Sequence, residues 1–171
     1  MVASLERSPG GHLAAVASRD AARAQAFADE HGAERACGGP DAVQRMLADP
    51  EVDAVYVATV HPVHHVAAQA ALLAGTPVLV EKPMTVSLAA ARDLVETARK
   101  RSVFLVEAYW TQLLPGTTVL LEVIGSGAIG DVQAVHADLG FPAPADAHRF
   151  HNPALGGGRC WTWARTRSGW R

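Results

Sequence analysis

The chain has 171 residues, of which 49% are hydrophobic and 19% are charged, and this composition predicts a globular protein with enough apolar material for a core. A net charge of -2 argues against a general basic surface for nucleic acid, and no apolar run approaches the roughly 18 residues of a membrane span. Cys37 and Cys160 make neither a disulfide framework nor a metal-binding spacing, so we expect a reduced, cytoplasmic protein without a metal site.

Short apolar strands alternate with helices through the first two thirds of the chain. The expected strands are residues 12–17, 35–37, 52–59, 77–80 and 103–107. The expected helices are residues 20–30, 41–48, 62–74 and 87–101. Strands that alternate with helices of this length predict a doubly wound parallel sheet. The strand from Val52 is apolar apart from Asp53, which is typical of a sheet that is covered on both faces.

The pattern changes at Pro115, where we expect a helix to about Ile124 and then a turn. Residues 132–141 alternate like an antiparallel strand, which predicts the start of a second domain. Two functions are open at this point: an enzyme that uses a dinucleotide, and a binding module without catalysis.

The expected strand at residues 77–80 runs into Glu81-Lys82-Pro83. Ligands bind at the carboxyl end of strands in an open α/β sheet, so a lysine here is a candidate catalytic group. The alternative is an exposed charged pair in a loop before the next helix. The tripeptide alone does not decide between them.

Several stretches together resemble the glucose–fructose oxidoreductase/inositol dehydrogenase/MocA family. Within it, the likeness is strongest to trans-1,2-dihydrobenzene-1,2-diol dehydrogenases and related NADP-dependent sugar dehydrogenases. The matching stretches, in the family's order, are residues 15–20, 52–59, 61–64, 74–75, 81–84, 107–110, 127–132, 149–150 and 156–158. The resemblance implies a Rossmann-type domain over residues 1–108 and the start of a substrate and dimerisation domain over residues 109–158.

The resemblance implies a cofactor-binding role for five residues that follow strands. Ser18 and Arg19 would meet the adenosine ribose, where a hydroxyl and a guanidinium suit the 2′-phosphate of NADP better than NAD. Thr59, His61 and Pro62 would contact the cofactor from the next loop, and they also suit a capped helix start. The alternative for the first pair is an exposed loop end.

Lys82 corresponds to the family's active-site lysine, and Glu81 would hold the cofactor or orient that lysine. The Lys82–Pro83 bond is expected to be cis, and Pro83 belongs to the cofactor loop. Trp110 and Arg149 would flank a carbohydrate-like substrate, or else be a core residue and a surface residue. The implied reaction is hydride transfer between NADP(H) and a sugar, polyol or dihydrodiol hydroxyl, in a full-length homo-oligomer without nucleic-acid or membrane partners.

The chain departs from the family near its beginning. No G-x-G-x-x-G follows a strand, and the expected chain start falls inside the helix that should follow that loop. A central strand between residues 12–17 and 52–59 would then be missing, which leaves two inner sheet edges unpaired and makes cofactor binding doubtful. A misassigned start codon or a genuine truncation would explain this.

Residues 159–171 also look foreign, because they hold three of the four tryptophans. If GC-rich codons are assigned to this tail and read one base earlier, they translate as Ala-Leu-Leu-Asp-Leu-Gly-Ala-Tyr-Pro-Leu, which resembles the family's sequence, so we expect a frameshift. The alternative is a Trp/Arg-rich tail that binds membrane or nucleic acid. Thr162 and Thr166 stand where the family has its proton-transfer pair. We therefore expect an inactive oxidoreductase fragment, with a non-catalytic nucleotide-binding or interaction module as the alternative.

Overall fold

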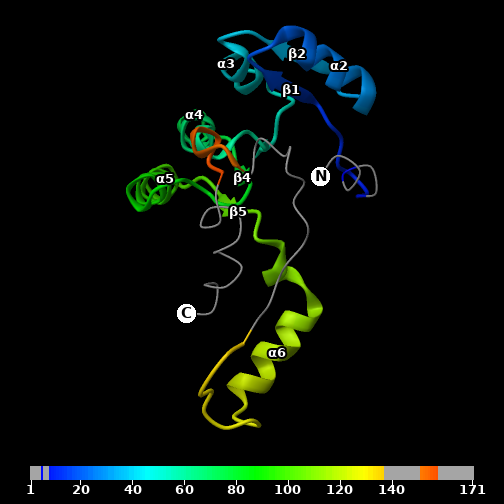
Figure 1. The fold of residues 1–171 in the computed structure, drawn as a ribbon. Coiled ribbons are helices and arrows are strands. Elements are labelled where there is room, and N and C mark those ends of the chain that lie inside the picture. The colour runs from blue at the N-terminus through cyan, green and yellow to red at the C-terminus, as the bar shows by residue number, and fades with distance from the viewer. Residues whose placement is uncertain (1–4, 6–7, 137–150, 158–171) are drawn as a thin grey trace.

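Two separate parallel sheets organise the molecule (Figure 1). The structure is a computed structural model that describes residue 5, residues 8–136 and residues 151–157. The strands are β1 (Ala15–Ser18), β2 (Arg35–Gly38), β3 (Val55–Val57), β4 (Val78–Val80) and β5 (Leu105–Glu107). The sheet orders are β1-β2 and β3-β4-β5, and every pair is parallel. The predicted Rossmann-type class is confirmed, and among the described residues the inner edges of β1 and β3 are unpaired, as expected.

The first unit is β1–α2–β2, in which α2 spans Ala21–His31. The Asp20 side chain caps this helix by accepting a hydrogen bond of 3.1 Å from the backbone amide three residues on. The helix ends at Gly32, whose φ of 68° lies in the left-handed region that glycine adopts readily. At the end of β2, a Cβ on Gly38 would lie 2.3 Å from the Ala21 Cα, so this close approach requires glycine.

The main core lies between the three-stranded sheet and the helices that pack against it. These helices are α3 (Ala42–Leu47), α4 (His64–Ala74) and α5 (Leu88–Arg101). Leu72 of α4, Leu94 of α5 and Val80 of β4 are all 0% exposed. Burying a leucine side chain stabilises a fold by about 1.5–3 kcal/mol. Met46 of α3 joins the same cluster, and Ala15 of β1 packs against it, so the core links the two sheets.

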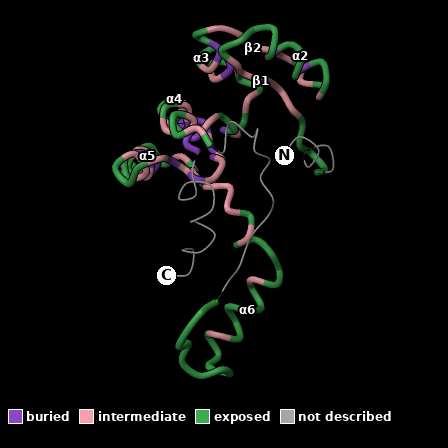
Figure 2. The backbone as a smooth tube through the Cα atoms, viewed as in Figure 1, coloured by how far each residue is buried: buried purple, intermediate pink, exposed green. Residues whose placement is uncertain are grey.

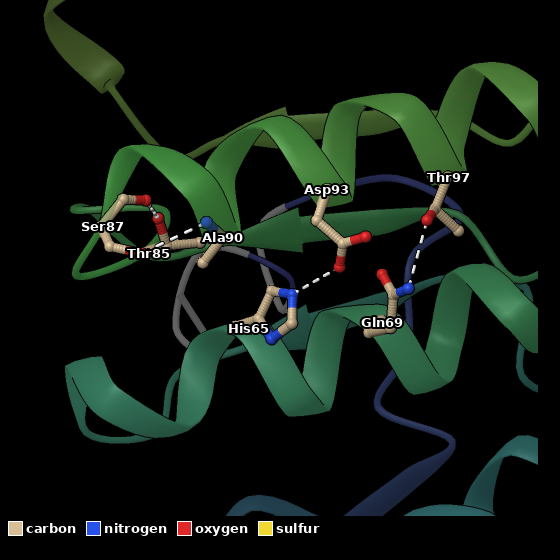
Figure 3. Close-up of polar contacts among 7 residues, drawn as sticks. All are labelled: His65, Gln69, Thr85, Ser87, Ala90, Asp93 and Thr97. Atoms are coloured by element: carbon tan, nitrogen blue, oxygen red, sulfur yellow. Dashed lines mark hydrogen bonds and ion pairs between the residues drawn. The ribbon is translucent and has the colours of Figure 1, made fainter.

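Polar contacts join α4 to α5 across their exposed side (Figure 3). The His65 ring contacts the Asp93 carboxylate at 2.7 Å, and the Gln69 amide donates to the Thr97 hydroxyl at 3.1 Å. At the start of α5, the Ser87 hydroxyl accepts the Ala90 N–H at 3.2 Å and caps the helix. These contacts fix the helix that carries His64 relative to α5.

The segment after β5 differs from the core because most of it is exposed (Figure 2). It contains the 3-10 helix η2 (Trp110–Leu113) and α6 (Pro115–Gly125). Leu120 and Leu121 of α6 are 44% and 52% exposed. The helix was predicted correctly, whereas residues 132–136 form no strand and the remainder of the expected strand lies outside the described residues.

The strands are shorter than the sequence predicted. Residues 52–54 precede β3 without joining it, although the whole apolar run suggested one strand. Residues 12–14 likewise lead into β1. Pairing, and not apolar composition, sets the strand length, because a ladder needs a partner strand on at least one side.

Candidate functional site

Three loops leave the same edge of the β3-β4-β5 sheet. The last residues of the three strands are in register, since Val57 pairs with Val80 and Val80 pairs with Glu107. The structure therefore brings Thr59 and residues 81–83, which the sequence singled out, to one carboxyl edge. In an open parallel sheet, this edge is the usual place for a ligand.

Glu81 is held by two hydrogen bonds at the start of the loop after β4. The Tyr56 hydroxyl of β3 donates to one carboxylate oxygen, and the Lys82 backbone N–H donates to the other at 3.1 Å. Burial raises the pKa of Tyr56, and the neighbouring Glu81 carboxylate raises it further, so the hydroxyl keeps its proton to a higher pH than an exposed tyrosine does. The carboxylate thus has a fixed orientation beside the half-buried Lys82.

The loop after Lys82 is fixed from both sides. The Lys82–Pro83 bond is cis, as predicted, and Pro83 is buried. The Pro83 carbonyl lies 2.8 Å from His64 Nδ1 on α4, and the Met84 N–H donates to Glu107 Oε1 of β5 at 2.7 Å. A neighbour on each side of β4 therefore holds the lysine loop in place.

The loop after β3 contains the other predicted cofactor residues of this sheet. Thr59 and Pro62 are exposed, and the Thr59 carbonyl lies 3.0 Å from His64 Nε2. His61 is only 5% exposed in η1 (His61–Val63), and its Nδ1 lies 3.0 Å from the Gly156 carbonyl. The structure thus places Thr59 and Pro62 toward solvent and His61 in a buried contact.

Ser18 is the last residue of β1, on the other sheet, and Arg19 follows it. Ser18 is half-buried, and its hydroxyl accepts the Asp20 N–H at 3.2 Å, whereas Arg19 is exposed. The arrangement leaves the guanidinium accessible to an anion in solution.

The two predicted substrate residues lie in different parts of the chain. Trp110 begins η2 and is 64% exposed, so the alternative reading of it as a core residue is wrong. Arg149, Thr162 and Thr166 lie outside the described residues. Predictions about these three residues stay predictions.

Three residues of this edge were not assigned a role from the sequence. Tyr56 lies within an apolar strand and Glu107 is the last residue of another, so neither position by itself indicates a side-chain contact. His64 could have been found, because it shares the buried face of α4 with Ala68 and Leu72 at helical spacing.

The described part of the chain shows neither a metal-binding cluster nor a membrane-spanning helix. It contains no group of three or more His, Cys, Asp or Glu side chains that could hold a metal ion. None of its helices is long and apolar enough to cross a membrane. For the chain as a whole, the expectation of no metal site stays a prediction from the sequence.

The described residues fit the two ends of a dinucleotide better than its middle. The exposed Arg19 guanidinium has the chemistry to pair with a phosphate, and Thr59 and residues 81–83 meet at one edge of the other sheet, where a nicotinamide would have to lie. The glycine turn at Gly38 and Gly39, which leads from β2 into α3, lacks the G-x-G-x-x-G pattern of the usual pyrophosphate cradle.

Comparison with known proteins agrees with this geometry. A sequence profile described as an oxidoreductase family with an NAD-binding Rossmann fold, GFO/IDH/MocA, matches residues 1–109. The trans-1,2-dihydrobenzene-1,2-diol dehydrogenase of Macaca fascicularis is 41% identical over 128 residues, which is 75% of this chain and 37% of that protein. The chain thus spans less than two fifths of the length of such relatives.

Solved structures give the same result. A 3-ketoreductase from Actinomadura kijaniata, in complex with NADP and TDP-benzene, is similar with a TM-score of 0.65 and 32% identity. That match covers 76% of this chain and 39% of the other. An aldose-aldose oxidoreductase from Caulobacter crescentus has a TM-score of 0.82 at 25% identity, over 94% of this chain and 49% of that one.

Proposed function

The chain belongs to the glucose–fructose oxidoreductase/inositol dehydrogenase/MocA family, and from that premise we propose that it forms the cofactor-binding and lysine-bearing part of an NADP-dependent dehydrogenase. The proposed substrate is a small carbohydrate-like molecule: a sugar, a polyol or a dihydrodiol. The names of the relatives support this substrate class. A homo-oligomeric full-length protein and a cytoplasmic location also belong to the proposal.

The observation that carries the proposal is the fixed geometry around Lys82. Its loop follows the central strand of a parallel sheet, and Glu81 and Pro83 on either side of it are both held by neighbouring elements. Such preorganisation is useful when a charged group must meet a ligand at a set position. An exposed charged pair in a mobile loop would not need these buried partners.

Each residue has a distinct part in the proposed chemistry. When bound, NADP would supply a hydride acceptor at its nicotinamide ring. Arg19 would bind the 2′-phosphate, Thr59 and Pro62 would line the nicotinamide end, and Glu81 would orient Lys82. The Lys82 ammonium would donate a hydrogen bond to the substrate hydroxyl oxygen and stabilise the negative charge that develops there, while the hydroxyl proton would pass to the proton-transfer pair that family members carry further along the chain.

Cofactor preference tests the proposal. We expect the 171-residue chain to bind NADPH more tightly than NADH in calorimetric titrations. Arg19→Ala should weaken NADPH binding by about 1.5–3 kcal/mol, which is roughly tenfold or more, and should change NADH binding little. Arg99→Ala, an exposed arginine in the last turn of α5, is the matched control and should change neither. Equal affinity of the wild type for both nucleotides would contradict the proposed NADP site.

Turnover tests the catalytic half of the proposal. The chain covers only 37% of a typical curated relative, so we propose that turnover needs more of the family's length than these residues contain. We expect no NADP⁺ reduction when the chain is mixed with a trans-dihydrodiol or a sugar. Measurable turnover would overturn that expectation and identify this chain as an enzyme by itself.

The second candidate is a non-catalytic interaction module, and α6 is the feature that favours it. Four large apolar residues of this helix are at least 38% exposed: Val119, Leu120, Leu121 and Val123. Apolar surface of this kind is often covered by a partner. Nucleotide binding without turnover in any extended version of the chain would support this candidate over the dehydrogenase.

A further inference from the structure

His64 occupies an unusual position for a histidine. It is 0% exposed at the first position of α4, the helix that connects β3 to β4. Its Nε2 lies 3.0 Å from the Thr59 carbonyl and its Nδ1 lies 2.8 Å from the Pro83 carbonyl. One buried ring therefore contacts both loops that frame the candidate nicotinamide end.

Both contacts involve carbonyl oxygens, which only accept hydrogen bonds. A neutral imidazole has one N–H and can donate to one of them, whereas a protonated imidazole can donate to both. The Pro83 contact is buried and the Thr59 contact is partly buried, so a carbonyl that loses its donor there is costly to leave unpaired. With both ring nitrogens protonated, the imidazole donates to both carbonyls and couples the two loops, so moving either loop away from His64 leaves a carbonyl without its donor.

A second histidine supports the first. The His61 ring packs edge to face on His64, with centroids 5.5 Å apart. His61 Nδ1 in turn contacts the Gly156 carbonyl, and a Cβ on Gly156 would lie 2.7 Å from the His61 Cβ. The imidazole of His64 thus has its own orientation restricted by packing.

We propose that His64 is a positioning residue that clamps the Thr59 and Pro83 carbonyls and so sets the separation between Thr59 and Lys82. The nicotinamide end of a dinucleotide would have to fit between these two loops, so the proposal rests on the proposed function for its ligand. The clamp itself is a property of the protein alone. It is measurable without any cofactor.

Three substitutions separate the two contacts. His64→Asn places an amide N–H near the Nδ1 position and keeps a donor for Pro83, whereas His64→Gln reaches the Nε2 position and keeps a donor for Thr59. His64→Phe keeps a ring and removes both donors. His65→Gln is the matched control, because the adjacent histidine is 33% exposed and contacts Asp93 on α5 instead.

Amide hydrogen exchange in the 171-residue chain reads out each loop separately. The Val63 N–H donates to the Val60 carbonyl in the first loop, and the Met84 N–H donates to Glu107 in the second. We expect His64→Asn to lower protection of Val63 by about tenfold and spare Met84, and His64→Gln to do the reverse. His64→Phe should lower both, and His65→Gln should lower neither.

The exchange rate of a core amide distinguishes a local clamp from a general loss of stability. The Val78 N–H, which donates to the Phe104 carbonyl at 2.9 Å, should be unchanged in the Asn and Gln variants. An equal loss at Val63, Met84 and Val78 would overturn the clamp, as would no loss at all in His64→Phe.

NADPH titration of the same variants tests the link to the ligand. We expect His64→Phe to bind NADPH about tenfold more weakly than the wild type, with His65→Gln unchanged. Equal binding by His64→Phe and wild type would overturn the positioning role. If the variants show the expected exchange pattern but the wild type binds no NADPH, the proposed function fails while the coupling of the two loops stands.

Discussion

The sheet β3-β4-β5 and the helix α6 both carry large apolar side chains but differ in what surrounds those side chains. The valines of β3 and β4 that face the helices are 0–8% exposed, whereas Leu120 and Leu121 of α6 are 44% and 52% exposed. Polar groups follow the same division, since the loops at the sheet edge are tied to neighbouring elements and α6 contacts mainly η2. Stability and the candidate site therefore reside in the same region.

Truncating the core should have the largest effect. We expect Leu72→Ala to lower the free energy of unfolding by about 2–5 kcal/mol, because the fully buried side chain leaves a cavity. Leu120→Ala in α6 is the matched control and should change it by less than about 0.5 kcal/mol. Urea unfolding followed by circular dichroism measures both. Equal effects would mean that α6 is packed as tightly as the sheet.

Adding a methyl group at Gly38 should have the next largest effect on stability. Gly38→Ala places a Cβ within 2.4 Å of both Ala21 Cα and Cβ, which requires β2 and α2 to move apart at a cost of about 1–3 kcal/mol. Gly125→Ala, at the end of α6 with nothing within 4 Å of its Cβ, is the control. Thermal unfolding should separate the two, and an unperturbed Gly38→Ala would contradict the close approach in the first unit.

Removing a helix cap should lower the free energy of unfolding by about 1 kcal/mol, both in the first unit and at the helix α5 of the main core. Asp20→Ala removes the cap of α2 and Ser87→Ala removes the cap of α5. Asp41→Ala is the control, since the Asp41 side chain makes no capping hydrogen bond to α3. If the first unit unfolds on its own, Asp20→Ala should increase amide exchange in β1–α2–β2 alone.

The dependence of stability on high pH should report the burial of Tyr56 at the sheet edge. Because the pKa of Tyr56 is raised in the folded state, chiefly by burial, the unfolded chain releases this proton at a lower pH than the folded chain does. Stability from this group is therefore present below the ordinary tyrosine pKa and is lost as pH rises above it. We expect Tyr56→Phe to flatten the fall in unfolding free energy above about pH 10. An identical pH profile for both proteins would contradict the burial of this hydroxyl.

The sequence predicted the order and type of nearly every element, because helix caps such as Asp20 and Ser87 and apolar periodicity are local signals. It also placed Thr59 and Lys82 on neighbouring loops, since parallel strands share a carboxyl edge. It could not pair Tyr56 with Glu81, because that contact depends on the register between β3 and β4. The double contact of His64 was missed for the same reason: its partners are five and nineteen residues away.

The most direct test of the central claim is backbone amide chemical-shift mapping while NADPH is added to the 171-residue chain. The account predicts saturable shifts at Arg19, Thr59 and Lys82, with α6 unchanged. Shifts confined to α6, or no saturable shift at the carboxyl edge of β3-β4-β5, would contradict the claim that this edge is a dinucleotide site.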